Sequence, residues 1–173
     1  MGVKPFCAAL LLAALPLLAN QERGGADPAR EGFARTAVDH SPGREIELRY
    51  RQLAWSDEAI GRVRADPGMR QRWNQSIPIA LQSELSTPVA LLIGGRRLEP
   101  DTYRIGLWLD EGGAFDLSIL LDHDYVRFPL ELAETDQRFP YLTWSLLPAP
   151  EGGLALVFQW GSEYGRIVLD FAR

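Results

Sequence analysis

The chain has 173 residues, of which 46% are hydrophobic and 24% are charged, with 16 Gly and 12 Pro. This composition is typical of one globular domain and excludes a disordered or collagen-like chain. The only unbroken apolar stretch has about a dozen residues, which is too short to span a bilayer, so no transmembrane segment is expected.

The first 19 residues have the pattern of a secretory signal peptide. Lys4 provides the basic start, an apolar run follows from Phe6 to Leu18, and cleavage is expected after Ala19. Residues 20–32 are rich in small and charged residues without apolar periodicity, so we expect a flexible leader. The sequence therefore predicts a periplasmic or secreted protein with one domain over residues 33–173.

Cleavage at this point would remove Lys4 and Cys7, the only lysine and the only cysteine of the chain. The mature protein would then have no disulfide, thiolate nucleophile, Schiff-base lysine or Cys-ligated zinc. Its basic residues would all be Arg, 17 of them against 23 acids, which gives a formal charge of −6. This negative charge disfavours nucleic acid as a partner.

The first predicted elements of the domain are a strand and a short helix. Apolar side chains at positions 46, 48 and 50 alternate with charged neighbours, which predicts a half-buried strand over residues 45–51. Ser56 can cap a helix that begins with Asp57 and Glu58 and runs to Ala65. Pro67 and Gly68 are expected to end it.

From residue 77 onward, apolar residues recur at every second position. They predict strands around residues 77–85, 89–93, 103–109, 115–121, 126–132 and 139–147. Because Pro129 cannot donate to a ladder, its strand is expected at a sheet edge. Residues 154–160 and 167–171 are expected to form a final hairpin, joined by the glycine-containing segment 161–165.

About nine closely spaced strands and one short helix favour a mainly β fold, an antiparallel β-sandwich. A sandwich is favoured over a barrel because the connections vary in length and a helix interrupts the strand order. No sequence repeat of fixed period is present, which argues against a propeller.

The sequence does not assign a catalytic residue, a metal site or a cofactor. His123 lies between Asp122 and Asp124, but we expect a solvated turn there, since three adjacent residues rarely ligate one ion. There is no G-x-S-x-G or S-x-x-K element for a serine nucleophile. A pair of carboxylates of the glycosidase type stays open, because the 23 acids offer many combinations.

Tryptophan and arginine residues provide the candidate ligand-binding site. The alternation that points Leu107 and Leu109 inward turns Trp108 outward, where its ring could stack on a sugar or an apolar ligand. We group Trp73, Arg49 and Arg51 with Trp108 as candidate ligand-binding residues, and whether they line one cleft or lie apart is the observation that tests this grouping. For Trp144 the alternation does not decide which face is buried. The expected ligand is a small molecule, a glycan or an envelope protein.

Several segments resemble the DUF2911 family of exported bacterial proteins. They are REIELRYRQLAWSDEAIGRV at 44–63, VALLIGGRRLEPDTYRIGLWLDEGGAFDLSILL at 89–121, and LALVFQWGSEYGRIVLDF at 154–171. The resemblance implies a β-sandwich of unassigned activity, with Gly94 and Gly95 forming a turn and Tyr103 facing inward. Asp101, the 50–53 segment and the 73–76 segment depart from the family's pattern, so a site built from those positions would be altered here.

We therefore expect an exported, non-enzymatic binding or envelope-associated accessory module. The alternative is a hydrolase that acts on envelope carbohydrate through paired carboxylates, and a third possibility is a structural partner protein. Two acids converging in an aromatic pocket would favour the hydrolase. A large exposed apolar patch would favour the structural partner.

Overall fold

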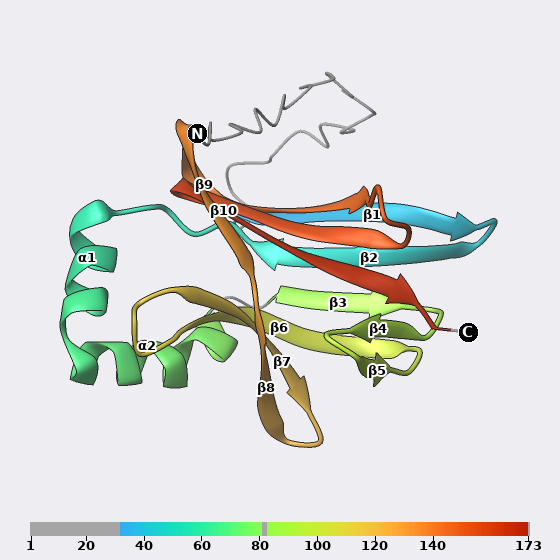
Figure 1. Cartoon of the computed structure of the whole chain (residues 1–173), viewed down its shortest axis with the longest axis horizontal. Helices are drawn as coiled ribbons and strands as arrows, with labels where there is room; N and C mark the ends of the chain where they lie inside the picture. The colour runs from blue at the N-terminus through green and yellow to red at the C-terminus, as the bar shows by residue number, and fades with distance from the viewer. Residues whose placement is uncertain (1–31, 81–82, 173) are drawn as a thin grey trace, which may run out of the picture.

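The computed structural model describes residues 32–80 and 83–172 and has a mainly β architecture (Figure 1). The strands are β1 (Phe33–Ser41), β2 (Arg44–Arg51), β3 (Ser83–Thr87), β4 (Leu91–Ile93), β5 (Arg96–Leu98), β6 (Asp101–Leu109), β7 (Phe115–Leu121), β8 (Asp124–Pro129), β9 (Glu131–Pro148) and β10 (Leu154–Phe171), and the helices are α1 (Asp57–Ala65) and α2 (Pro67–Ala80). The predicted signal peptide and all of the predicted leader except Gly32 lie outside the described residues.

The strands form two antiparallel sheets. One has the order β1-β2-β3-β6-β7-β8, and the other has the order β5-β4-β10-β9. Side chains of both sheets form one hydrophobic core, which includes Leu48 and Leu117 from the first sheet and Leu156 and Leu169 from the second. The predicted fold class is confirmed, and the described residues form ten strands and two helices in place of about nine and one.

Most of the predicted strands are confirmed where polar and apolar residues alternate cleanly. In β2 the side chains of Ile46, Leu48 and Tyr50 are buried. The predicted 126–132 strand ends earlier, because β8 stops at Pro129, and β8 is indeed the edge strand of its sheet. Trp144, which the alternation left undecided, is 1% exposed and lies in the core.

The segment around Pro67 differs from the prediction. α1 begins as expected, with the Ser56 hydroxyl accepting a hydrogen bond from the Ala59 N–H. Pro67 does not end the helical region but opens α2, because the Asp66 carboxylate accepts the N–H groups of Gly68 and Met69, and proline is well suited to the first helical turn. The strand predicted from residue 77 is therefore wrong as far as Ala80.

α2 packs beside the part of β6 that does not pair with β3. Ser83, the first residue of β3, lies opposite Ile105, so the later part of β6 has no strand neighbour on that side among the described residues. The Asn74 side chain takes this place, since its amide donates to the Leu109 C=O at 2.8 Å and accepts the Leu109 N–H at 2.9 Å. Both helices lie at one end of the sheets (Figure 1).

The predicted final hairpin is wrong in its pairing. Residues 154–160 and 167–171 belong to one strand, β10. On one side β10 pairs with β9, which is equally long. The pairing runs from Leu154 opposite Pro148 to Arg166 opposite Glu131. The register shifts around Gly161, so the glycine segment bends the strand and does not close a hairpin.

The bend folds β10 back on itself, as Figure 1 shows. A straight strand would separate Gly153 from Leu169 by about 50 Å. A Cβ on Gly153 would instead lie 2.4 Å from the Leu169 backbone oxygen, so the beginning and end of β10 are in contact. Ala155 and Val157 of the first half pack against Tyr164 and Val168 of the second half in a small additional core.

Candidate functional site

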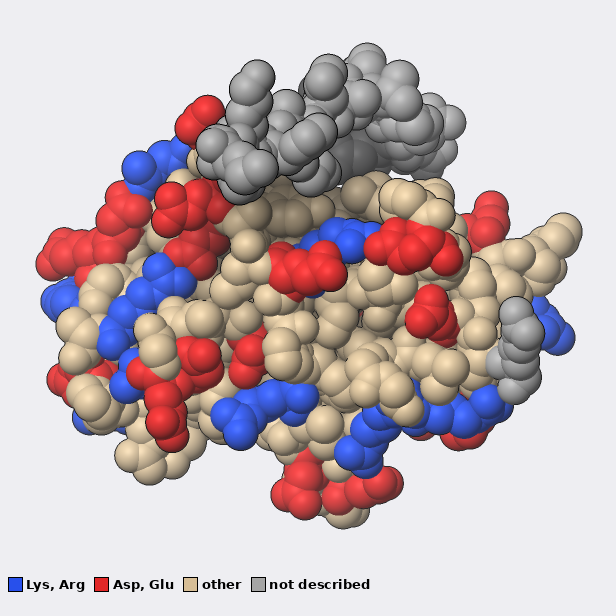
Figure 2. Space-filling model, in the orientation of Figure 1, with Lys and Arg blue, Asp and Glu red and all other residues tan. Residues whose placement is uncertain are grey.

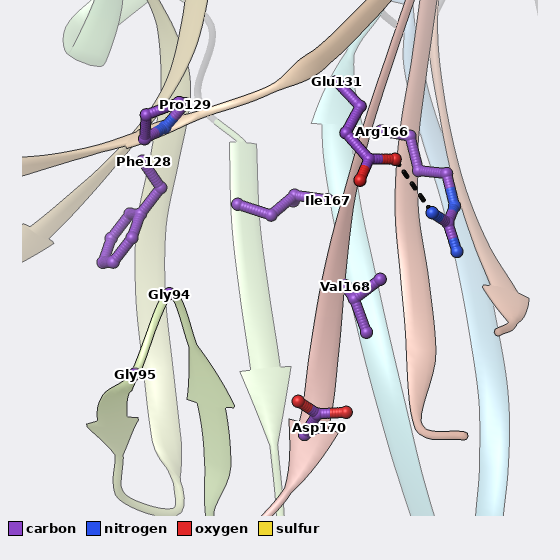
Figure 3. Close-up of a pocket in the computed structure, with 9 residues that line it drawn as sticks. All are labelled: Gly94, Gly95, Phe128, Pro129, Glu131, Arg166, Ile167, Val168 and Asp170. Atoms are coloured by element: carbon purple, nitrogen blue, oxygen red, sulfur yellow. Dashed lines mark hydrogen bonds and ion pairs between the residues drawn. The ribbon is translucent and has the colours of Figure 1, made fainter. Parts of the chain in front are cut away.

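A groove of about 350 Å³ lies where the edges of the two sheets approach each other (Figure 3). Its lining comes from four segments: the β4–β5 turn, the end of β8, the start of β9 and the second half of β10. These residues are Gly94, Gly95, Phe128, Pro129, Glu131, Arg166, Ile167, Val168 and Asp170. We call it the inter-sheet groove.

The β4–β5 turn closes one end of the inter-sheet groove. Gly94 and Gly95 both adopt positive φ, 54° and 80°, which favours glycine at both positions. A Cβ on Gly94 would lie 3.1 Å from Cδ1 of Phe128, so the turn approaches the edge of the opposite sheet closely. The expected Gly94–Gly95 turn is confirmed, and it links the short β4–β5 hairpin to β8.

The inter-sheet groove follows the edge of β10. Successive side chains of a strand point to opposite faces, yet Arg166, Ile167 and Val168 all line the groove. A hollow bordered by consecutive residues runs along the strand's edge, where the backbone N–H and C=O groups are presented. Ile167, Val168 and the buried ring of Phe128 give it an apolar lining.

The backbone groups that face the inter-sheet groove can be assigned from the hydrogen bonds of β10. The Ala172 N–H donates to the Ala90 C=O, and Asp170 lies opposite Leu92, so these residues of β10 face β4. Because backbone groups alternate along a strand, Val168 and Arg166 face the same side. β4 ends at Ile93, so on this side of β10 no strand pairing is shown for Val168 or Arg166 among the described residues, while on the other side Arg166 lies opposite Glu131 of β9.

Arg166 stands at the rim of the inter-sheet groove between two carboxylates. Its guanidinium donates to Glu131 at 2.9 Å (Figure 3) and to Glu151 at 2.5 Å. The hydrogen bonds that Arg166 donates to Glu151 and Glu131 raise the pKa of Arg166, and the same bond to Glu151 lowers the pKa of Glu151. With the exposed Asp170, the rim has three acids and one arginine, a net negative charge.

Trp108 lies elsewhere, on the outer face of the six-stranded sheet. Its predicted outward orientation is confirmed, since Leu107 and Leu109 are buried and Trp108 is half-buried. The Arg127 guanidinium reaches across β7 to lie 5.5 Å from the centre of the Trp108 ring. One face of the indole is therefore already occupied by a cation.

Two polar residues of β7 lie near this pair. Burial raises the pKa of Asp116, the charge of Asp110 adds to the rise, and Arg127 opposes it. Ser118 is 0% exposed, and its hydroxyl has no hydrogen-bond partner among the described residues. This outer-face cluster, formed by Trp108, Arg127, Asp116 and Ser118, therefore contains a carboxylate with a raised pKa.

The structure does not bring the four predicted ligand-binding residues together. Trp73 points into the core, where its ring stacks with that of Trp160 at 5.9 Å, and its N–H donates weakly to the Leu107 C=O. Arg49 and Arg51 are exposed on β2, and Arg49 lies near Glu47. None of the four lines the inter-sheet groove, and a ligand-binding role for them stays a prediction.

The described residues contain no group of three or more His, Cys, Asp or Glu that could hold a metal ion. The 122–124 segment forms the exposed turn that we expected, with Asp122 and His123 at φ 50° and 76°. These values match a two-residue hairpin turn, which needs positive φ at both central positions.

Charges on the visible face are mixed in sign. Arginine and acidic residues lie interspersed across the described surface in Figure 2. Neither described helix is long and apolar enough to cross a membrane. Four large apolar side chains on β1 and β9 are exposed: Phe33, Leu132, Tyr141 and Leu147.

Comparison of the chain with protein-family models, with curated proteins and with solved structures gives no match.

Proposed function

We propose that this chain is an exported, non-enzymatic binding module of the DUF2911 type, periplasmic or secreted, that holds its ligand in the inter-sheet groove. The observation that carries the proposal is the combination of an apolar lining with backbone groups of Arg166 and Val168 that have no strand partner on the groove side among the described residues. Apolar concave sites with a few fixed polar groups are the usual form of ligand sites. Export rests on the signal-peptide pattern of residues 1–19.

The carboxylates at the inter-sheet groove support binding over catalysis. A general acid needs a raised pKa, whereas Arg166 lowers the pKa of Glu151. Both Glu131 and Glu151 are engaged by the same guanidinium, which holds them in place. The pair therefore fits a fixed recognition element better than the acid and nucleophile of a glycosidase.

A hydrolase acting on envelope carbohydrate is the second candidate, and one observation favours it. Asp116 has a raised pKa and lies beside Trp108 with Asp110 near it, which is the kind of carboxylate that a general acid requires. In this case the outer-face cluster, and not the inter-sheet groove, would be the site.

An NMR screen with the ¹⁵N-labelled mature chain separates these functions. The panel contains chito-oligosaccharides, muropeptides, short peptides and fatty acids, and each sample is re-examined after a day for consumed ligand. The proposal predicts that one class shifts the amides of Gly94, Gly95 and Val168 and is not consumed. Shifts confined to Trp108 and Asp116, consumption of a glycan, or no shift with any class would contradict it.

A further inference from the structure

The edge of β10 offers a ready position for one more strand. β4 pairs with β10 only at Leu92 and Leu91, and the Gly94–Gly95 turn then leads the chain away to β5. An extended segment placed beyond Ile93 would continue the line of β4 along β10. It would meet the groove-facing N–H and C=O groups of Val168 and Arg166.

The walls on both sides fit such an added strand. In an extended segment, side chains alternate between two faces, and the inter-sheet groove has apolar groups on both sides of the β10 edge, Ile167 on one and Val168 on the other. Ile167 points into the space between β10 and the end of β8 (Figure 3). A short segment with a β-branched residue would fill this space while its backbone pairs with β10.

Charge indicates the composition of the added segment. Arg166 is paired with Glu131 and Glu151, and Asp170 lies further along β10, so these groups together carry three negative charges against one positive charge. Asp170 is exposed, and the structure shows no ion pair for its carboxylate among the described residues. A lysine or arginine of the incoming segment would supply the missing positive charge.

From these observations we propose that the ligand is an extended, basic peptide segment of a partner protein, which adds to the free edge of β10 next to β4. This inference rests on the proposed binding function and specifies its ligand class. The backbone pairing provides register and much of the affinity, and the acidic rim selects a basic side chain.

Synthetic pentapeptides test the proposal on the full mature chain. The probe is acetyl-TVKVT-amide, with acetyl-TVEVT-amide as its charge-reversed counterpart, and binding is measured by titration of the groove amides in NMR spectra. The basic peptide is expected to bind at least about tenfold more tightly than the acidic one.

Backbone methylation tests strand addition directly. One variant of the basic peptide carries N-methyl groups on residues 2 and 4, and the other carries one on residue 3. Because alternate amides of a strand face the same neighbour, one variant should lose binding by about tenfold or more while the other keeps it. Equal affinity of both variants and the parent peptide would overturn the added strand.

A charge reversal on the protein completes the test. Asp170→Lys is expected to weaken the basic peptide about tenfold, since it reverses the unpaired charge at the rim. The matched control is Glu111→Lys, an exposed acid in the β6–β7 turn, which should leave binding unchanged. Equal effects of the two variants, with native circular dichroism in both, would contradict the acidic-rim part of the proposal.

The outcomes distinguish this inference from the function on which it rests. If a glycan or lipid shifts the groove amides and the peptide does not, the peptide inference is wrong and the binding function stands. If no class shifts these amides, both are wrong.

Discussion

Gly165 allows the two halves of β10 to pack closely. A Cβ at this position would lie 2.0 Å from Cε1 of Phe158, a ring that is 0% exposed and packs against Trp144 and Phe115. Glycine is therefore required at this position because of the close contact with Phe158, and not because of its φ, which is not in the positive range. The bend that shapes the inter-sheet groove depends on this missing side chain.

Gly165→Ala is expected to destabilise the fold by about 1–3 kcal/mol, the usual cost of overpacking a core. The control is Gly61→Ala in α1, where a Cβ meets nothing within 4 Å. In that control the free energy of unfolding should rise by about 0.5–1 kcal/mol, because alanine is the better helix former. Urea denaturation measures both, and a Gly165→Ala protein as stable as the wild type would contradict the close packing.

The raised pKa of Asp116 makes a pH-dependent prediction. A carboxyl whose pKa is raised by folding binds more protons in the folded state, so its contribution favours folding at acid pH. That contribution is lost as pH rises from the ordinary value of 3.8 through the raised one. Asp116→Asn removes the ionised group, so it should raise Tm at pH 7 and have no effect near pH 3.

Thermal unfolding at several pH values checks this expectation. Asp136→Asn, which changes an exposed acid of β9, serves as the control. A lower Tm for Asp116→Asn at pH 7 would show that folding stabilises the Asp116 anion, and a difference from the wild type that does not vary with pH would show that folding does not shift its pKa; either result would contradict the expectation.

At the scale of elements, Asn74 joins α2 to the uncovered edge of β6. Its side-chain amide forms both hydrogen bonds to Leu109 that a neighbouring strand would provide, and it is 8% exposed. Loss of this amide would leave the buried backbone N–H and C=O of Leu109 without these partners.

Asn74→Ala should therefore cost about 1–3 kcal/mol of the free energy of unfolding. Gln75→Ala, at the exposed neighbouring position of the same helix, should change it by less than about 0.5 kcal/mol. Equal values for the two variants in denaturant titrations would contradict the strand-like role of Asn74.

The elements that could be predicted from the sequence are those whose signal is local. The alternation in β2, β6 and β7 and the Ser56 cap require only neighbouring residues, and these predictions are confirmed. β1 gives a weaker signal, since its inward positions are small residues such as Ala34 and Thr36. The sequence does not predict α2, because Pro67 can end a helix as well as open one and because the Ile77–Ile79 alternation is compatible with a strand.

The pairing of β10 could not be read from the sequence for a different reason. A glycine segment between two apolar runs predicts a hairpin, but β9 offers a partner long enough to pair with both runs. The choice between these partners depends on contacts between distant residues, such as those of Gly153 with Leu169 and of Gly161 with Trp55.

At the scale of the whole molecule, the candidate site is a product of assembly. The inter-sheet groove combines residues from the 94–95, 128–131 and 166–170 segments, which come together only when the two sheets pack and β10 folds back. The sequence pointed instead to aromatic residues, and Trp73 is used in the core. In the sequence, the features that point to this region are the Gly94–Gly95 turn and Pro129, which predicts an edge strand.

Amide hydrogen exchange tests the central claim, that the edge of β10 at the inter-sheet groove is open for a ligand. In the free protein, the amides of Arg166 and Val168 should exchange rapidly. The amides of Gly165 and Ile167 should be protected because they face β9, and the amide of Asp170 should be protected because it faces β4. Saturation with the basic peptide should slow exchange at Arg166 and Val168 about tenfold or more. Protection of these two amides in the free protein, or unchanged exchange with the peptide bound, would contradict the account.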